Sequence, residues 1–256
     1  MADVRDQMTE RLLVDAGIGA GMRVLDVGCG HGEVSWMIAR LVGDAGHVLG
    51  VDRDPRALAA ARERAHELGL SNVAFAEADV GALSRDHAPF DAPFDAVVGR
   101  RVLMYQPDPA AAVRRLAALL RPGGLMVFQE HDATMTPASR VPLPLHARVH
   151  GWIWQTVERE GANVHMGFDL PPVLGQAGLA VEHVRAEAVV LTPAAPYPFG
   201  AIIRAMLPRI VQHGVAAEPE LDVETLDRRL AAEREQAAAT YIGDMVFGVW
   251  ARKPAA

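Results

Sequence analysis

The 256-residue chain has 25 basic and 32 acidic side chains, and its net charge of −7 argues against a nucleic acid partner, which normally requires a basic face. One cysteine, Cys29, excludes an internal disulfide and favours a reducing, cytoplasmic compartment. The charged N-terminal segment predicts no signal peptide, and no apolar run reaches the roughly 18 residues of a membrane helix. We therefore expect a cytoplasmic protein that does not engage membranes.

The first half of the chain alternates helix and strand patterns. A helix is predicted over residues 1–19, and glycines end it. Strands are predicted at 23–27, 47–51, 73–77, 94–99 and 125–130. Helices are predicted near 32–42, 55–68 and 109–120, with prolines in the first turns of the last two. This alternation is typical of an α/β fold with a doubly wound parallel sheet.

The second half breaks the alternation. Proline-rich connectors are predicted at 136–144 and 192–198. Amphipathic helices are predicted at 145–159, 170–178, 199–213 and 222–239, and Pro208 is expected to kink or interrupt the third of them. Strands are predicted near 180–191 and 244–253.

A glycine-rich turn follows the first predicted strand, where residues 26–32 read DVGCGHG. Glycine lets a ligand approach backbone that a Cβ would block, and the helix behind the turn offers free N–H groups. The next predicted strand ends at Asp52, and a carboxylate there can accept hydrogen bonds from both hydroxyls of a ribose. The pattern indicates a site for a cofactor that contains a nucleoside.

The glycine spacing argues against a dinucleotide. The dinucleotide motif G-x-G-x-x-G has its third glycine at the sixth position, where this chain has Glu33. A carboxylate there would repel a pyrophosphate. A nicotinamide-dependent oxidoreductase is therefore the less favoured alternative.

Five segments, in order, resemble the class I S-adenosylmethionine (SAM) methyltransferases, especially those of ubiquinone and menaquinone biosynthesis and of natural products. They are VLDVGCGHG, HVLGVD, EADV, FDAVVGRRVLMYQPD and LRPGGLMVFQE. The resemblance implies a Rossmann-like doubly wound sheet with a final antiparallel strand beside the fifth, plus a helical lid. It implies a SAM-binding core over residues 1–135, lid insertions at 136–166 and 193–240, and the remaining core sheet at 167–192 and 241–256.

The resemblance also implies which residues bind SAM. The acid and loop at the first strand would hold the methionine end, the end of the second strand the ribose, and the following segments the adenine side and the backbone contacts. In that order they are Asp26, Gly28, Cys29, Gly30 and Gly32; Asp52 and Arg53; Asp79 and Val80; Gly99 and Arg100. We expect no metal ion, because His146 and His150 have no H-E-x-x-H motif and no obvious third ligand.

Methyl transfer from a sulfonium is a direct displacement, so the protein must mainly position the reactants and exclude water. A base is needed only where the acceptor starts protonated. His131 follows the fifth predicted strand and is our candidate base, and His146 and His150, on one helix face, compete with it. Further candidates for the substrate pocket are Tyr105, Arg101 and Tyr197.

The loop after the fourth predicted strand reads GRRVLMY. Enzymes that methylate amino groups of nucleic acids have an Asn/Asp-Pro-Pro-aromatic motif there. The difference favours a small-molecule substrate, with oxygen, nitrogen or carbon as the acceptor. A protein of this fold that uses bound SAM or S-adenosylhomocysteine for a reaction other than methylation is the second hypothesis. We expect a monomer or a homodimer.

Overall fold

The computed structural model describes residues 4–83, 92–135, 137–193 and 199–255. Tyr197 lies outside these residues. The chain forms two compact units: the first contains Met1–Glu130, Met166–Ala186 and Phe247–Ala256, and the second contains His131–His165 and Glu187–Val246. Each unit is described by itself below.

A seven-stranded mixed sheet has the strand order β3-β2-β1-β4-β5-β7-β6. Strands β1 to β5 pair in parallel, with β1 between β2 and β4. The strands are β1 (Arg23–Val27), β2 (His47–Asp52), β3 (Val73–Glu77), β4 (Phe94–Arg100), β5 (Leu120–Asp132), β6 (Ala180–Leu191) and β7 (Tyr241–Arg252). The predicted doubly wound sheet is confirmed, and β7 lies beside β5 as expected.

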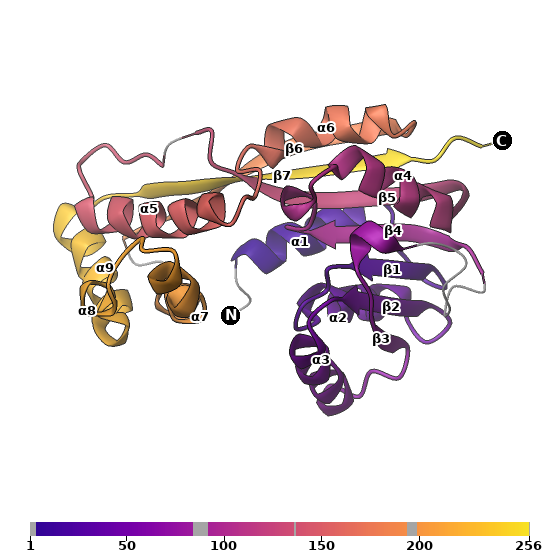
Figure 1. Cartoon of the computed structure of the whole chain (residues 1–256), viewed down its shortest axis with the longest axis horizontal. Coiled ribbons are helices and arrows are strands. Elements are labelled where there is room, and N and C mark those ends of the chain that lie inside the picture. Colours follow the sequence, from indigo (N-terminus) through magenta and orange to yellow (C-terminus); the bar gives the residue numbers. More distant parts are fainter. Residues whose placement is uncertain (1–3, 84–91, 136, 194–198, 256) are drawn as a thin grey trace. The chain divides into compact units, whose positions relative to one another are not determined.

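The parallel strands of the first unit lie side by side in Figure 1. On one face of this sheet, Leu12 and Leu13 of α1 (Val4–Asp15) and Ile38 of α2 (Glu33–Val42) pack into a buried core with alternate strand residues. Because successive side chains of a strand point to opposite faces, buried residues such as Leu25 and Val97 lie on the other face. The strand order reverses at β1, where open α/β sheets bind their ligands.

The two helices with predicted N-terminal prolines begin as expected. Asp54 caps α3 (Pro55–Glu67), where its carboxylate accepts a hydrogen bond of 2.8 Å from the backbone N–H of Arg56. Asp108 caps α4 (Pro109–Leu119) by accepting from the N–H of Ala111 at 2.8 Å. Proline at the first helical position costs no hydrogen bond, so both starts are locally determined.

The second unit contains the helices α5 (Pro144–Arg159), α7 (Phe199–Gln212), α8 (Glu218–Leu221) and α9 (Val223–Ala237), which gather together in Figure 1. Helices α5, α7 and α9 contact one another. The remaining helix, α6 (Met166–Gln176), belongs to the first unit and contacts α4. None of the helices in the described residues is long and apolar enough to cross a membrane.

Some element boundaries differ from prediction. Strand β5 begins at Leu120 rather than residue 125, because a register shift opposite Phe94 accommodates the Pro-Gly-Gly segment that we expected as a turn. Helix α7 runs through Pro208 as one helix, so Pro208 does not interrupt it, and a kink at this residue stays a prediction. Helix α8 and the short 3₁₀ helices η1 (Val80–Ala82) and η2 (Leu103–Tyr105) were not predicted, since each is a single turn without a periodic pattern.

Candidate functional site

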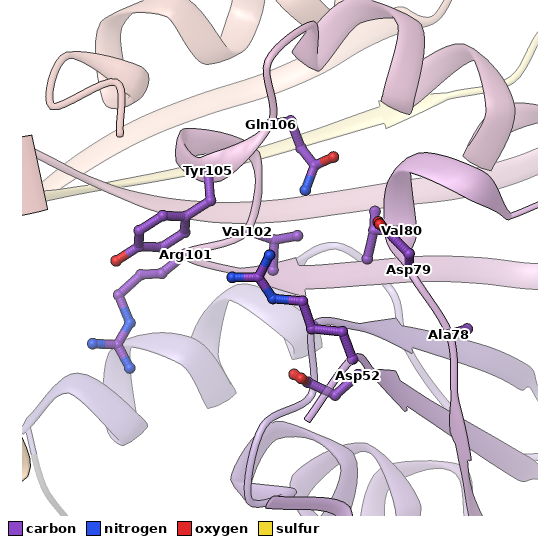
Figure 2. Close-up of a pocket in the computed structure, with 10 residues that line it drawn as sticks. Asp52, Ala78, Asp79, Val80, Arg101, Val102, Tyr105 and Gln106 are labelled. Atoms are coloured by element: carbon purple, nitrogen blue, oxygen red, sulfur yellow. The ribbon is translucent and has the colours of Figure 1, made fainter. Parts of the chain in front are cut away.

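A cavity of about 250 Å³ lies in the first unit, against residues that follow the carboxyl ends of β1, β2, β3 and β4. In Figure 2, Arg101 and Tyr105 stand on one side of it and Ala78, Asp79 and Val80 on the other. The residues that line it are Gly28, Asp52, Arg53, Ala78, Asp79, Val80, Arg101, Val102, Tyr105 and Gln106. Seven of these were predicted as site residues, and Ala78, Val102 and Gln106 were missed.

The glycine loop needs glycine for its left-handed backbone and, at its two ends, for close packing. Gly28, Gly30 and Gly32 all have left-handed backbone, with φ of 63°, 52° and 94°. A Cβ on Gly28 would lie 2.6 Å from Cγ2 of Val102, and one on Gly32 would lie 2.9 Å from Nε1 of Trp36. A Cβ on Gly30 would meet no heavy atom of the described residues within 4 Å. The loop is therefore packed at its ends and open in the middle.

Asp52 joins this loop to the end of β2. Its Oδ2 accepts a hydrogen bond from the N–H of Gly30 at 2.8 Å, and its Oδ1 accepts one from the N–H of Asp54 at 3.0 Å. Each carboxylate oxygen retains a further acceptor site. Asp52 can therefore hold the loop and receive two hydroxyl groups at the same time. On the far wall, Asp79 accepts a hydrogen bond of 2.8 Å from the N–H of Gly81.

Two predicted cofactor residues are buried at the glycine loop, where Asp26 precedes the loop and Cys29 lies within it. Asp26 is 1% exposed and accepts a 2.5 Å hydrogen bond from the hydroxyl of Ser35. Burial raises the pKa of Asp26 to about 7, although the bond from Ser35 acts to lower it. Burial also raises the pKa of the Cys29 thiol, so this residue is a poor nucleophile. Neither residue is among those that line the cavity, and contact of either with a cofactor stays a prediction.

We predict that the buried carboxyl of Asp26 makes the free energy of unfolding depend on pH. Its folded pKa of about 7 lies above the ordinary aspartate pKa of 3.8, so the folded state keeps a proton that the unfolded chain releases. The free energy of unfolding should therefore fall as pH rises between those values, by up to about 1.4 kcal/mol per pH unit. Urea denaturation from pH 5 to 8 measures this slope. Asp26→Asn should reduce the slope, and equal slopes in the two proteins would contradict the prediction.

Two further predicted cofactor residues have partners away from the cavity lining. A Cβ on Gly99 would lie 2.3 Å from the ring of Phe128, so close strand packing requires glycine there. Arg100 pairs with Asp6 of α1 at 2.9 Å and donates to the hydroxyl of Thr9 at 3.3 Å. The lack of a side chain at Gly99 and the contacts of the Arg100 side chain thus serve the fold. Backbone contact with a cofactor stays a prediction for each.

Glu130, which was missed in the sequence, positions the loop that carries Arg101 and Tyr105. Its Oε1 accepts hydrogen bonds from the backbone N–H groups of Val102 at 2.9 Å and Leu103 at 2.7 Å. The side chain is fully buried, and burial raises its pKa to about 7 against these hydrogen bonds. Glu130 therefore fixes one wall of the cavity from below. The signal in the sequence that could have identified Glu130 is an acidic residue directly after an apolar strand.

The three candidate histidines belong to the second unit and have two kinds of environment. His146 is completely buried, with Nδ1 at 2.7 Å from Glu233 and Nε2 at 2.8 Å from Arg234 of α9. Burial lowers its pKa, although the hydrogen bond to Glu233 acts to raise it. These contacts join α5 to α9 and disfavour His146 as a base.

His131 and His150 instead meet at Asp244 of β7, a residue that sequence reasoning missed. His150 Nε2 lies 2.5 Å from Oδ1 of Asp244, His131 Nδ1 lies 3.5 Å from Oδ2, and the indole N–H of Trp154 donates to Oδ1 at 2.9 Å. Burial acts to raise the pKa of Asp244, but the hydrogen bonds from the two histidines outweigh it and lower the pKa. Asp244 is therefore an anion that orients both imidazoles. No group of three or more His, Cys, Asp or Glu side chains among the described residues could hold a metal ion.

Comparison with known proteins connects this geometry to a family. Residues 18–171 match the model of a family described as a methyltransferase domain. The chain belongs to this methyltransferase family. The matched range contains the glycine loop and every residue that lines the cavity of the first unit. The resemblance to class I SAM-dependent methyltransferases is confirmed.

Individual methyltransferases match only part of the chain. Trans-aconitate 2-methyltransferase from Methylobacterium nodulans is 34% identical over 140 residues, which are 55% of this chain and 50% of the relative. A ubiquinone biosynthesis O-methyltransferase from Methylocella silvestris is 41% identical over 115 residues, which are 45% of this chain and 42% of the relative. The chain spans about half the length of the curated relatives it matches.

Solved structures of similar fold cover nearly all of the chain. A SAM-dependent methyltransferase from Aquifex aeolicus superposes with a TM-score of 0.56 and 17% identity, covering 96% of this chain and 89% of that one. The [4+2]-cyclase SpnF superposes with a TM-score of 0.57 and 22% identity, covering 98% of this chain and 82% of that one. At these identities the likeness shows the fold alone.

Proposed function

We propose that the chain is a SAM-dependent methyltransferase that acts on a small organic molecule. The observation that carries this proposal is the double role of Asp52, whose carboxylate lines the cavity and also holds the N–H of Gly30 at 2.8 Å. That arrangement places a diol acceptor directly beside a loop with open space at its centre. Membership of the methyltransferase family supports the same function.

The residues at the cavity fit the nucleoside and methionine parts of SAM. Asp52 has an acceptor site left on each oxygen for a ribose hydroxyl. Ala78, Asp79 and Val80 form a wall of mixed polarity that suits an adenine. The open space at Gly30 leaves room for the methionine end. When bound, the cofactor supplies a methyl group activated by a sulfonium.

A small-molecule acceptor is favoured by the relatives and by charge. The names of the matched enzymes concern trans-aconitate and ubiquinone biosynthesis, both of which are small-molecule chemistry. The net charge of −7 disfavours a polyanionic nucleic acid. The second candidate function is a reaction other than methylation on the same fold, and a [4+2]-cyclase is among the solved structures of similar fold.

Within this proposal, His150 is the residue that removes a proton from the acceptor. Its Nε2 faces the Asp244 carboxylate at 2.5 Å, so the neutral ring holds its hydrogen there and keeps the lone pair on Nδ1. His150 also lines a cavity of the second unit. His131 and His146 are not among the residues that line it. It is the favoured base of the three histidines.

The test combines cofactor binding with product formation. We expect calorimetry to show binding of SAM and S-adenosylhomocysteine in the micromolar range, and no binding of NAD. Incubation with SAM and a panel of small organic acids, phenols and amines should release S-adenosylhomocysteine with at least one acceptor. Absence of SAM binding would contradict the proposal. Binding without methylation of any acceptor would favour the second candidate function.

Asp52→Ala tests the cofactor site directly. We expect it to weaken S-adenosylhomocysteine binding by about 1.5–3 kcal/mol, the usual scale for hydrogen bonds to a charged group. Titration calorimetry of the wild type and the variant measures the difference. Asp54→Ala is the matched control, because Asp54 caps α3 and is not among the residues that line the cavity. Equal affinity of wild type and Asp52→Ala would refute the ribose assignment.

A further inference from the structure

Arg101 is a cation in the lining of the first unit's cavity, where Asp52 and Asp79 are the acidic residues. The carboxylates of both acids already accept hydrogen bonds from backbone N–H groups. No carboxylate of the described residues forms an ion pair with the guanidinium of Arg101. This positive charge is therefore available to a ligand in the cavity.

The backbone of Arg101 is held in a conformation that is uncommon for a residue with a Cβ. Its φ is 57°, in the left-handed region. Its own N–H donates to the carbonyl of Gln129 at 2.8 Å, and Glu130 accepts hydrogen bonds from the N–H groups of Val102 and Leu103. Strained backbone persists where the surrounding structure imposes it, and such positions cluster at ligand sites. The end of β5 thus imposes the backbone that directs this side chain.

The side chain of Arg101 is open to solvent but has protein and like charges around it. Desolvation by the surrounding protein lowers its pKa, and the positive charges of Arg100 and Arg5 act in the same direction. A side chain that solvent reaches and that protein still desolvates lies in a concave site. Asp6 balances the charge of Arg100 at 2.9 Å. Arg101 has no such partner among the described residues, so a bound anion would balance its charge.

Tyr105 supplies a second donor near Arg101. Figure 2 shows both side chains extending toward the same side of the cavity, away from Asp79 and Val80. The two are close enough for Tyr105 to influence the pKa of Arg101. Tyr105 is 42% exposed, and its hydroxyl has no hydrogen bond partner in the described part of the chain. A guanidinium and a phenol match a carboxylate, which accepts hydrogen bonds from both.

We propose that Arg101 and Tyr105 form a subsite that binds a ligand carboxylate in the cavity lined by Asp52. The subsite uses residues of the first unit alone. It rests on the proposed methyltransferase function for the identity of its ligands. Two of these can carry a carboxylate: the methionine end of the cofactor and an acidic acceptor. Two titrations distinguish them.

The first titration isolates the carboxylate of the cofactor. Calorimetry compares S-adenosylhomocysteine with S-adenosyl-3-thiopropylamine, which is the same molecule without its carboxylate. If the subsite holds the cofactor, the wild type should bind S-adenosylhomocysteine about tenfold or more tightly, the scale of a hydrogen bond between charged groups. Arg101→Gln should remove this preference.

The second titration isolates the carboxylate of the acceptor. Protein saturated with S-adenosylhomocysteine is titrated with 4-hydroxybenzoate, 4-hydroxycinnamate and 3-(4-hydroxyphenyl)propionate, and with the neutral amide of each. If the subsite holds the acceptor, at least one acid should bind about tenfold or more tightly than its amide, and Arg101→Gln should remove that preference. Tyr105→Phe removes a single exposed hydroxyl from a folded protein and should reduce whichever preference the wild type shows.

Two other arginines serve as comparisons. Arg114→Gln changes an exposed arginine of α4 that does not line the cavity, and both preferences should stay as in the wild type. Arg53→Gln changes the other arginine of the cavity lining. If Arg53→Gln removes the preference and Arg101→Gln does not, the carboxylate is bound at Arg53 and the proposal is wrong.

The remaining outcomes separate the subsite from the proposed function. If the wild type shows neither preference, or if Arg101→Gln and Tyr105→Phe keep it unchanged, the subsite is wrong while cofactor binding still stands. If the wild type does not bind S-adenosylhomocysteine, the proposed function fails. The acid and amide titrations of the protein without cofactor then still judge the subsite.

Discussion

His150→Ala is expected to lower turnover by about 10²–10⁴-fold, the usual contribution of a general base, while the affinity for S-adenosylhomocysteine stays the same. The reason is the fixed geometry of the ring, with Nε2 at 2.5 Å from the Asp244 carboxylate and Nδ1 left as the basic nitrogen. In the proposed reaction, an acceptor hydroxyl would give its proton to Nδ1. Single-turnover kinetics with a hydroxylated acceptor, together with calorimetry of the cofactor, measure both quantities.

Three further variants test whether the loss of turnover is specific to His150 and its partner Asp244. Asp244→Asn should also lower turnover, because an amide can stabilise the wrong tautomer of His150 and no longer balances its charge. His131→Ala should change turnover little, since His131 lies 3.5 Å from Asp244 and does not line the cavity of the second unit. His66→Ala, an exposed change on α3, is the neutral control. If His131→Ala alone abolishes turnover, the base is His131. If every variant remains active, the enzyme works by positioning alone.

Gly30→Val is expected to abolish measurable SAM binding in a protein that remains folded. Position 30 has a φ of 52°, which costs a residue with a Cβ about 1–2 kcal/mol, but the space beside it is free of described protein atoms. A side chain there therefore occupies the room that we assign to the cofactor. Circular dichroism and calorimetric titration with SAM together decide the outcome. Normal SAM binding by this variant would show that the loop does not contact the cofactor.

Gly28→Val is the informative partner of that variant. A Cβ at position 28 would lie 2.6 Å from Cγ2 of Val102, so this change adds overpacking of about 1–3 kcal/mol to a similar backbone strain. We expect a clear loss in the free energy of unfolding as well as loss of binding. Urea denaturation separates the two variants. Equal stability of Gly28→Val and Gly30→Val would contradict the packing difference between the ends and the middle of the loop.

The sequence predicted the sheet and most of the residues that line the cavity of the first unit, because both depend on local order along the chain. Strand, turn and helix follow one another at the glycine loop, and parallel pairing brings the ends of β1 and β2 together, so Asp52 could be placed beside Gly30 in advance. Asp79 and Val80 follow from the same rule, since β3 pairs in parallel with β2.

The roles of Glu130 and Asp244 could not be predicted in this way. Glu130 acts on amides 27 and 28 residues earlier in the chain, and Asp244 meets His150 across 94 residues. Helical spacing correctly put His146 and His150 on one face of α5 but could not distinguish them. Their difference comes from the neighbouring elements, because α9 supplies Glu233 and Arg234 to one ring and β7 supplies Asp244 to the other.

The bond from Gly30 to Asp52 has a consequence for how the cofactor associates. Because this carboxylate already fixes the loop at 2.8 Å in the protein alone, the loop has little conformational entropy left to lose when a ligand arrives. The cofactor should then bind in one step to a preorganised loop. The observed association rate constant should rise linearly with cofactor concentration, and no slow ordering phase should appear. Asp52→Ala would release the loop, and a slower, saturating association phase would be the kinetic sign that preorganisation had been lost.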